Sequence, residues 1–257
     1  MGLPFCIRGG KVRGREHTRA GKNCQDGYEL ERANVLGKEY LIGAISDGCG
    51  EGGGSEIAAL MLPKFVVAQV QHLLLFETPI SQIPVSLYPA VIGFLESIRK
   101  QFPFANSQKI IEFISENLLA TVLGFVIGET EGVAFHAGDG FVVVNEQTIK
   151  IEHGNESPYI GYHLVPHSAL KKEASELPRT FSVITLPTEK LQRLVIASDG
   201  FSGQLMERMF QEANPAPLGI QLWLNLINGP RNPEPEKGLF YDDGAVIWAE
   251  RNEEENA

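Results

Sequence analysis

Residues 41–59 read LIGAISDGCGEGGGSEIAA. The apolar run before Ser46 predicts a strand, Asp47 opens a glycine-rich loop, and Ser55 predicts the N-cap of a helix. The same order of apolar strand, serine and Asp-Gly pair returns in RLVIASDG, residues 193–200. Two distant strand ends therefore carry a carboxylate in the same context, and only a fold that gathers strand ends could bring them together.

Aspartate is rare in this chain, and its placement is uniform. The chain has 32 acidic residues, of which six are aspartate: Asp26, Asp47, Asp139, Asp199, Asp242 and Asp243. Each one lies next to an apolar, strand-like run, and all except Asp242 are followed directly by glycine. An Asp-Gly pair is also a favoured two-residue hairpin turn, and for Asp139-Gly140 taken alone we favour that interpretation. The set of six favours a metal site, because carboxylate and carbonyl oxygens bind hard cations such as Mg²⁺, Mn²⁺ or Ca²⁺.

The rest of the sequence predicts the α+β class, an antiparallel sheet with helices on its faces. We expect strands over 28–32, 39–46, 181–186, 193–198 and 244–250, and an antiparallel meander of four short strands over 120–152. We expect helices over 55–76, 86–101, 107–117, 204–213 and 218–228, with a kink or break at Pro63 and a connection over 79–89. A single domain would span residues 1–250, followed by a disordered acidic tail over 251–257.

Composition excludes several classes of function. The net charge of −10 argues against binding to a nucleic-acid backbone, and no run of eighteen apolar residues predicts a membrane span. The N-terminal residues lack the apolar core of a secretory signal, and the three cysteines lack metal-binding spacing. We therefore expect a cytoplasmic protein without nucleic-acid or membrane partners, and the sequence leaves its oligomeric state open.

Other hydrolytic chemistries lack their motifs. Neither Cys24 nor Cys49 has an arginine six residues downstream, and no Gly-x-Ser-x-Gly elbow is present. His163 and His167 have the spacing of metal ligands on a helix, but Pro166 between them argues against a helix. Hydrolysis of a phosphate monoester by water that two metal ions activate needs no protein nucleophile, and this agrees with the missing motifs.

Six segments, taken in order, resemble the motifs of the type 2C, metal-dependent Ser/Thr protein phosphatases. They are NCQDGY (23–28), SDGCGEGGGSEIAA (46–59), ATVLGFVIG (120–128), HAGDGFVVV (136–144), SDGFSG (198–203) and DDGAVI (242–247). The resemblance spans about residues 20–249 and is closest to divergent bacterial members of the family. It implies a four-layer αββα sandwich of two antiparallel sheets flanked by helix pairs.

The resemblance also implies a site for two Mg²⁺ or Mn²⁺ ions, or three, and a phosphoprotein substrate. The implied ligands are Asp26, Asp47, the Gly48 carbonyl, Asp139, Asp199 and Asp242. Asp47 would bridge two ions, Asp199 and Asp242 would complete that catalytic centre, and Asp26 would contribute directly or through water. Asp139 would hold the third ion together with Asp199. The implied reaction is hydrolysis of phosphoserine or phosphothreonine in proteins.

Three positions depart from the family pattern. Gly21 stands near the place of the arginine that usually binds the substrate phosphate, Gln25 replaces an acidic residue, and Cys49 replaces a histidine proposed as general acid in some members. The candidates to replace the arginine are His17, Arg19 and Lys22. Asp243 lies where the family motif has asparagine, so we expect Asp243→Asn to matter less than changes at the ligands.

Two further hypotheses stay open beside the phosphatase. The first is a catalytically weak or inactive family member that binds a phosphoprotein partner as a regulator, which the missing arginine favours and the complete aspartate set disfavours. The second is a structural Ca²⁺-binding domain, which would explain the Asp-Gly pairs without catalysis.

Overall fold

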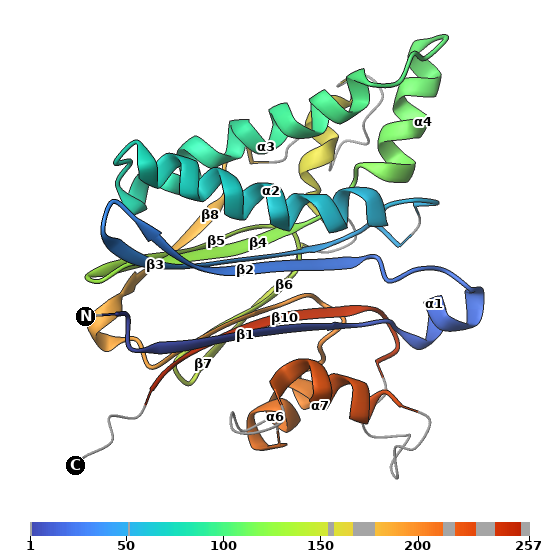
Figure 1. Cartoon of the computed structure of the whole chain (residues 1–257). Coiled ribbons are helices and arrows are strands. Elements are labelled where there is room, and N and C mark those ends of the chain that lie inside the picture. Colours follow the sequence, from blue (N-terminus) through green and yellow to red (C-terminus); the bar gives the residue numbers. More distant parts are fainter. Residues whose placement is uncertain are drawn as a thin grey trace, which may run out of the picture.

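The computed structural model describes residues 2–50, 52–153, 157–166, 178–212, 219–229 and 240–252. Two five-stranded antiparallel sheets pack face to face, and helices cover their outer faces (Figure 1). The first sheet has the order β2 (Asp26–Val35), β3 (Lys38–Asp47), β4 (Val122–Ile127), β5 (Glu131–Ala137), β8 (Ser182–Pro187). The second has the order β1 (Phe5–Val12), β10 (Gly244–Arg251), β9 (Arg193–Ala197), β6 (Gly140–Val144), β7 (Gln147–Ile151). This αββα sandwich of the α+β class confirms the predicted fold.

Helices cover both sheets. Over the first sheet lie α2 (Glu56–Leu75), α3 (Ile83–Lys100) and α4 (Ser107–Asn117), and over the second lie α6 (Gly203–Glu212) and α7 (Gly219–Ile227). The short helix α1 (Arg15–Ala20) stands at one end of the sandwich, and the 3-10 turns are η1 (Ile80–Gln82), η2 (Ile160–Leu164) and η4 (Thr188–Lys190). The first sheet thus carries one helix more than the expected pair.

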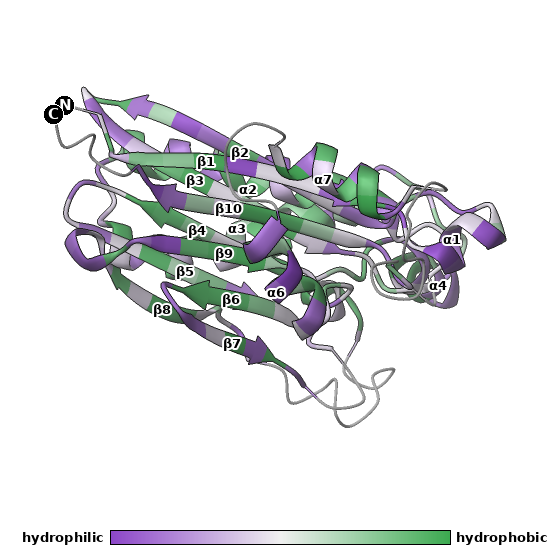
Figure 2. Ribbon diagram, turned by 90° about the horizontal axis from the view of Figure 1, so that it is seen from below, coloured by the Kyte–Doolittle hydropathy of each residue, from purple (hydrophilic) through white to green (hydrophobic). Residues whose placement is uncertain are grey.

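The alternation of side chains along a strand explains why β3 has an almost unbroken apolar sequence. Ile42 and Ala44 face α2 and α3, whereas Leu41 and Ile45 face the second sheet. A strand that is covered on both faces needs apolar residues at every position. Figure 2 shows the same pattern in β9 and β10, which are mostly hydrophobic. A third apolar layer joins the second sheet to α6 and α7.

Several predicted elements need correction. Helix α2 runs through Pro63 without a break, and α3 begins at Ile83, inside the predicted connection, with Pro84 in its first turn, where proline is favoured. The strand β1 and the helix α1 were not predicted: the apolar residues of FCIRGGKV do not alternate with polar ones, its pairing with β10 is a long-range contact, and α1 has only six residues. The meander over 120–152 is in fact two hairpins, because β4 and β5 lie in one sheet and β6 and β7 in the other.

Among the described residues, α2 is the one helix long and apolar enough to span a membrane by length and composition. Its buried face, which includes Leu62, Val66 and Val70, packs with the first sheet in the same apolar cluster. A core helix of this kind has the same composition as a membrane span, so packing on the sheet accounts for it.

Candidate metal centre

The hairpin of β2 and β3 brings two of the predicted ligands together. Asp26 begins β2, Asp47 ends β3, and the two residues lie directly opposite each other in the antiparallel register. Thr121 holds the strand end: its Oγ1 accepts from the Asp47 N–H at 3.0 Å, and its own N–H donates to the Asp47 carbonyl at 2.8 Å. The pair therefore has a fixed backbone at one end of the first sheet.

The second sheet adds carboxylates at the same end of the sandwich. Asp199 follows β9, and Asp242 and Asp243 precede β10, which pairs with β9. Ser198 joins the two sheets, because its Oγ donates to Asp26 Oδ2 at 2.6 Å and accepts from the Ala245 N–H at 2.9 Å. The adjacent ends of both sheets thus form one acidic site.

The carboxylates of this site destabilise one another's charge. Burial, together with the negative charges of Asp243 and Asp199, raises the pKa of Asp26 to about 7. Burial and the neighbouring Asp26 and Asp199 raise the pKa of Asp47 well above its usual value. The pKa of Asp199 is also raised, by burial first and then by Asp242 and Asp139. Such a cluster of oxygen ligands fits a divalent cation, which would neutralise the repulsion.

One atom of the cluster supports this fit independently. Asp26 Oδ1 is buried, and it has no hydrogen-bond partner among the described residues. A buried carboxylate oxygen without a donor is costly. An oxygen ligand position for a cation, directly or through water, would satisfy it, so the described residues fit the implied metal.

The glycines after the aspartates serve close packing and not hairpin turns. A Cβ at Gly200 would lie 1.7 Å from the Asp243 carbonyl oxygen, and a Cβ at Gly27 would lie 2.1 Å from the Ala59 oxygen. Asp139-Gly140 joins β5 in the first sheet to β6 in the second, so the hairpin-turn interpretation of that pair is wrong.

Asp139 has a partner that the sequence did not indicate. His153 Nδ1 lies 2.7 Å from Asp139 Oδ1, and both side chains are partly exposed. Asp139 also lies near enough to Asp199 to raise the pKa of that carboxyl. The structure therefore places Asp139 at the edge of the acidic site with one oxygen already engaged.

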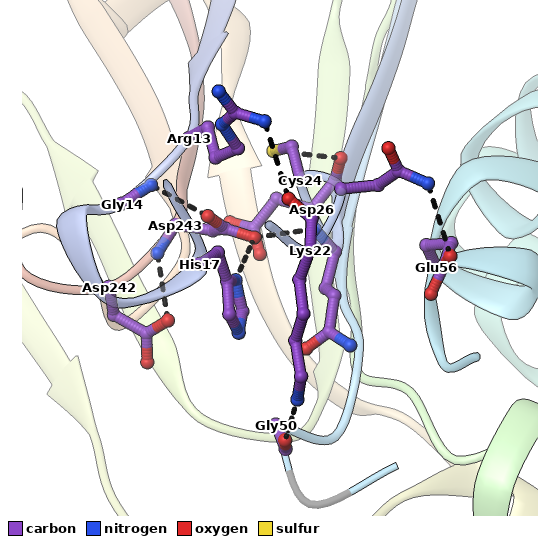
Figure 3. Close-up of polar contacts among 12 residues, drawn as sticks. Arg13, Gly14, His17, Lys22, Cys24, Asp26, Gly50, Glu56, Asp242 and Asp243 are labelled. Carbon is purple, nitrogen blue, oxygen red and sulfur yellow. Dashed lines mark hydrogen bonds and ion pairs between the residues drawn. The ribbon is translucent and has the colours of Figure 1, made fainter. Parts of the chain in front are cut away.

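Asp243 is buried and holds the backbone around the site (Figure 3). Its Oδ1 accepts from the Gly14 N–H at 2.7 Å, and its Oδ2 accepts from the Gln25 N–H at 2.5 Å. The same Oδ2 lies 2.7 Å from His17 Nδ1. Asparagine has one carbonyl oxygen and could not accept from all three of these groups. Asp243 therefore has a structural role, and the expectation that Asp243→Asn would matter little did not take this role into account.

Asp242 and His17 lie next to this residue. Asp242 is exposed, and its Oδ1 accepts from the Asp243 N–H at 2.8 Å. One ligand atom from each of His17, Asp242 and Asp243 lies within 4.8 Å of the others. His17 is therefore a member of the acidic site itself. From the sequence it was only a candidate for binding the substrate phosphate.

The other phosphate-binding candidates are exposed. Arg19 lies on the surface of α1, and Lys22 Nζ donates to the Gly50 carbonyl at 3.4 Å. Arg13 was not among the candidates, although its Nη1 donates to the Lys22 carbonyl at 3.3 Å. The signal in the sequence that could have identified Arg13 was the number of cationic residues in and around α1.

The absence of arginine at position 21 has a structural reason. Gly21 ends α1 with a φ of 66°, in the left-handed region; its N–H donates to the Thr18 carbonyl and the Lys22 N–H donates to the His17 carbonyl. Glycine is favoured at this C-terminal position because it has no Cβ, whereas a long side chain such as that of arginine would be strained there.

His163 accepts or donates at Nε2 to the Tyr88 hydroxyl, 2.7 Å away, and lies in the 3-10 turn η2. His167 lies outside the described residues. The disfavoured histidine metal site therefore gains no support.

The sandwich and its cluster of carboxylates define a class of protein that holds divalent cations between the ends of two sheets. A family model for protein phosphatase 2C matches residues 13–231. The chain belongs to the protein phosphatase 2C family, whose members are metal-dependent phosphatases. A comparison with curated proteins finds no match.

Solved bacterial phosphatases share the fold. Serine/threonine phosphatase Stp1 from Staphylococcus aureus aligns with a TM-score of 0.58 and 15% identity over 97% of this chain and 96% of that one. A bacterial serine phosphatase aligns with a TM-score of 0.54 and 15% identity, over 95% and 97%. The catalytic domain of PstP, solved in complex with two manganese ions, aligns with a TM-score of 0.50 and 14% identity, over 96% and 97%. At these identities the likeness shows the fold.

Proposed function

We propose that this protein hydrolyses phosphate monoesters in a metal-dependent reaction and that its substrates are phosphoserine and phosphothreonine in proteins. The observation that carries the proposal is the cluster of Asp26, Asp47 and Asp199, drawn from both sheets and raised in pKa by burial and mutual repulsion. Membership of the family and the fold of the bacterial phosphatases support it.

The residues that would hold two Mg²⁺ or Mn²⁺ ions are Asp26, Asp47, the Gly48 carbonyl, Asp199 and Asp242. Asp47 would contribute to holding both ions in this proposal, because its carboxyl interacts with those of both Asp26 and Asp199. Bound ions would neutralise the charge of the phosphoryl group and lower the pKa of a coordinated water. A third ion at Asp139 would share that side chain with His153 or displace it.

Several residues of this chain would orient the site. Ser198 and Thr121 fix the carboxyl of Asp26 and the backbone of Asp47. Asp243 engages Nδ1 of His17, which leaves Nε2 as the ring nitrogen available to a phosphate oxygen.

Six cations precede the first acidic motif in the sequence. Residues 8–22 contain Arg8, Lys11, Arg13, Arg15, Arg19 and Lys22 in a chain of net charge −10. In this proposal Arg19, Lys22 and Arg13 attract the phosphate without the paired hydrogen bonds of a buried arginine, so the Michaelis constant for small phosphate esters is high.

The test is turnover of an aryl phosphate and of a phosphopeptide after EDTA treatment, with and without added Mn²⁺ or Mg²⁺. We expect no turnover in the metal-free protein and recovery with either ion. The variant Asp47→Asn should not recover, whereas Glu31→Gln, which removes an exposed carboxylate, serves as its matched control and should recover. Full activity without metal would refute the mechanism.

The regulator is the second candidate, and Gly21 in place of the usual arginine is the observation that favours it. Metal-dependent binding of a phosphopeptide without turnover of any phosphoester would support that reading. Binding of Ca²⁺ alone, with neither turnover nor phosphopeptide binding, would support the structural domain.

We propose a cytoplasmic protein of one domain over residues 1–250, without nucleic-acid or membrane partners, that acts in signalling.

A further inference from the structure

A groove of about 450 Å³ lies at the end of the sandwich opposite α1 and the acidic site. Three connections form it: the β2–β3 turn, the segment from α2 to η1, and the β4–β5 turn (Figure 1). A groove of this volume is large enough for a ligand or for several side chains of a peptide. None of its lining residues belongs to the acidic site, so the proposed phosphatase activity does not account for it.

The groove has an apolar floor and an exposed apolar rim. Val35, Leu74 and Ile80 are buried at its floor. Leu36 lines it with 62% of its surface exposed, and Phe76, which lies in the chain between the lining residues at 74 and 77, is 73% exposed. Large apolar side chains that remain exposed around a groove indicate a surface for a partner.

The backbone supports this interpretation. Three non-glycine residues in the described chain have positive φ, and two of them, Leu36 at 52° and Glu77 at 55°, line the groove. Asparagine or glycine is favoured in this conformation, and leucine costs about 1 kcal/mol or more. Asparagine at position 36 would therefore make the fold more stable than leucine does, and what leucine adds is an exposed apolar side chain.

Charge selects the occupant. Glu77, Glu129 and Glu131 are exposed on two walls of the groove and make no ion pair with other described residues, whereas Lys38 is the one cation of the lining. Glu39 also lines the groove, but it is engaged by Arg32 and by the Leu3 N–H. The occupant must therefore carry positive charge beside an apolar group.

Two occupants from this chain itself fit poorly. Residues 253–255 are three glutamates, which have the same sign as the groove. A second copy carries a net charge of −10, which opposes its approach to an acidic surface, and its own basic stretch over residues 8–22 is largely engaged in β1, paired with β10, and in α1. A basic segment of another protein has the complementary charge.

We propose that this groove binds a basic segment of a partner protein, with an apolar side chain against Leu36 and the groove floor and with lysine or arginine facing Glu77, Glu129 and Glu131. The site is independent of the acidic site and of its activity.

The experiment titrates the full chain with a fluorescein-labelled peptide of alternating leucine and lysine and follows fluorescence anisotropy. The variant Glu77→Lys/Glu129→Lys/Glu131→Lys reverses the groove charge. The matched control Glu116→Lys/Glu146→Lys/Glu207→Lys makes the same change in net charge at exposed residues outside the groove. A second pair compares Leu36→Asn, which suits the positive φ, with Leu226→Asn on α7, which is also exposed.

We expect the groove reversal to weaken peptide binding about tenfold or more, and the control to change it less than about twofold. Leu36→Asn should weaken binding and Leu226→Asn should not, while a peptide with asparagine in place of leucine should bind weakly to every variant. Equal weakening by both charge variants would overturn the proposal, because it would show attraction to the net charge alone. Absence of binding, or a change in oligomeric state caused by the groove variants alone, would also overturn it, the latter in favour of a second copy.

Discussion

The acidic site should make the metal-free protein less stable as pH rises. Burial and neighbouring charges raise the pKa of Asp26 from 3.8 to about 7. Between these two values the folded protein keeps a proton that the unfolded chain has released. The free energy of unfolding therefore falls as pH rises through this window. Each pH unit corresponds to about 1.4 kcal/mol for one group, so Asp26 accounts for about 4 kcal/mol.

The variant Asp26→Asn removes this titration and resembles the protonated carboxyl. Its amide oxygen can still accept from Ser198, and its N–H₂ can donate to Asp47. In EDTA at pH 8 we expect Asp26→Asn to be more stable than the unaltered protein, by an amount approaching about 4 kcal/mol, with a smaller difference at pH 5. Part of the pH dependence should persist, because the pKa of Asp47 is raised as well.

Urea unfolding followed by circular dichroism at pH 5 and pH 8 measures these differences, with Glu31→Gln as the control for loss of an exposed carboxylate. Added Mn²⁺ should reverse the order once its concentration exceeds about a thousand times its dissociation constant, because a ligand that binds only the folded state stabilises it by about 4.1 kcal/mol at that concentration. A metal-free protein that is equally stable at both pH values, or more stable at pH 8, would refute the reasoning.

Three further outcomes follow from individual residues. Asp47→Asn and Asp199→Asn should each lower metal-dependent turnover of an aryl phosphate by about a hundredfold or more with an unchanged circular dichroism spectrum, and unaltered turnover would exclude both as ligands. Asp243→Asn should lower the free energy of unfolding by about 1–3 kcal/mol, because one oxygen cannot serve the donors at Gly14, Gln25 and His17, and urea unfolding in EDTA tests this. Gly200→Ala should destabilise the fold by about 3 kcal/mol or more in the same assay, since its Cβ would lie 1.7 Å from a carbonyl oxygen, and a neutral effect would contradict the close packing.

Most of the strands and helices could be predicted because their signals are local. The run LIGAIS before Asp47 reads as a strand in isolation, and the structure has β3 over Lys38–Asp47. The expected helix over 107–117 agrees with α4, whose N-cap Asn106 accepts from the Lys109 N–H. The exceptions have a common cause. The strand β1 forms through its pairing with β10, from the opposite end of the chain, and no window of sequence contains that contact.

The residues of the candidate site likewise fall into those that the sequence indicates and those that only the structure places there. The rarity of aspartate and its position at strand ends could be recognised from the sequence, because short carboxylates beside apolar runs form a local pattern. The partners His17 and His153 could not be assigned, because the contacts that engage them join segments far apart in the chain or on opposite sides of a loop.

The sequence by itself determined most of the strands, which loops are rich in glycine, and which side chains are available as oxygen ligands. Only the tertiary structure decided that Asp139-Gly140 crosses between sheets, that Asp243 holds backbone N–H groups while Asp242 stays exposed, and that Gly200 permits close packing. The physical reason is that the identity of most strands depends on residues a few positions apart. The role of a carboxylate depends on which donors and charges the packing of two sheets places within a few ångströms of it.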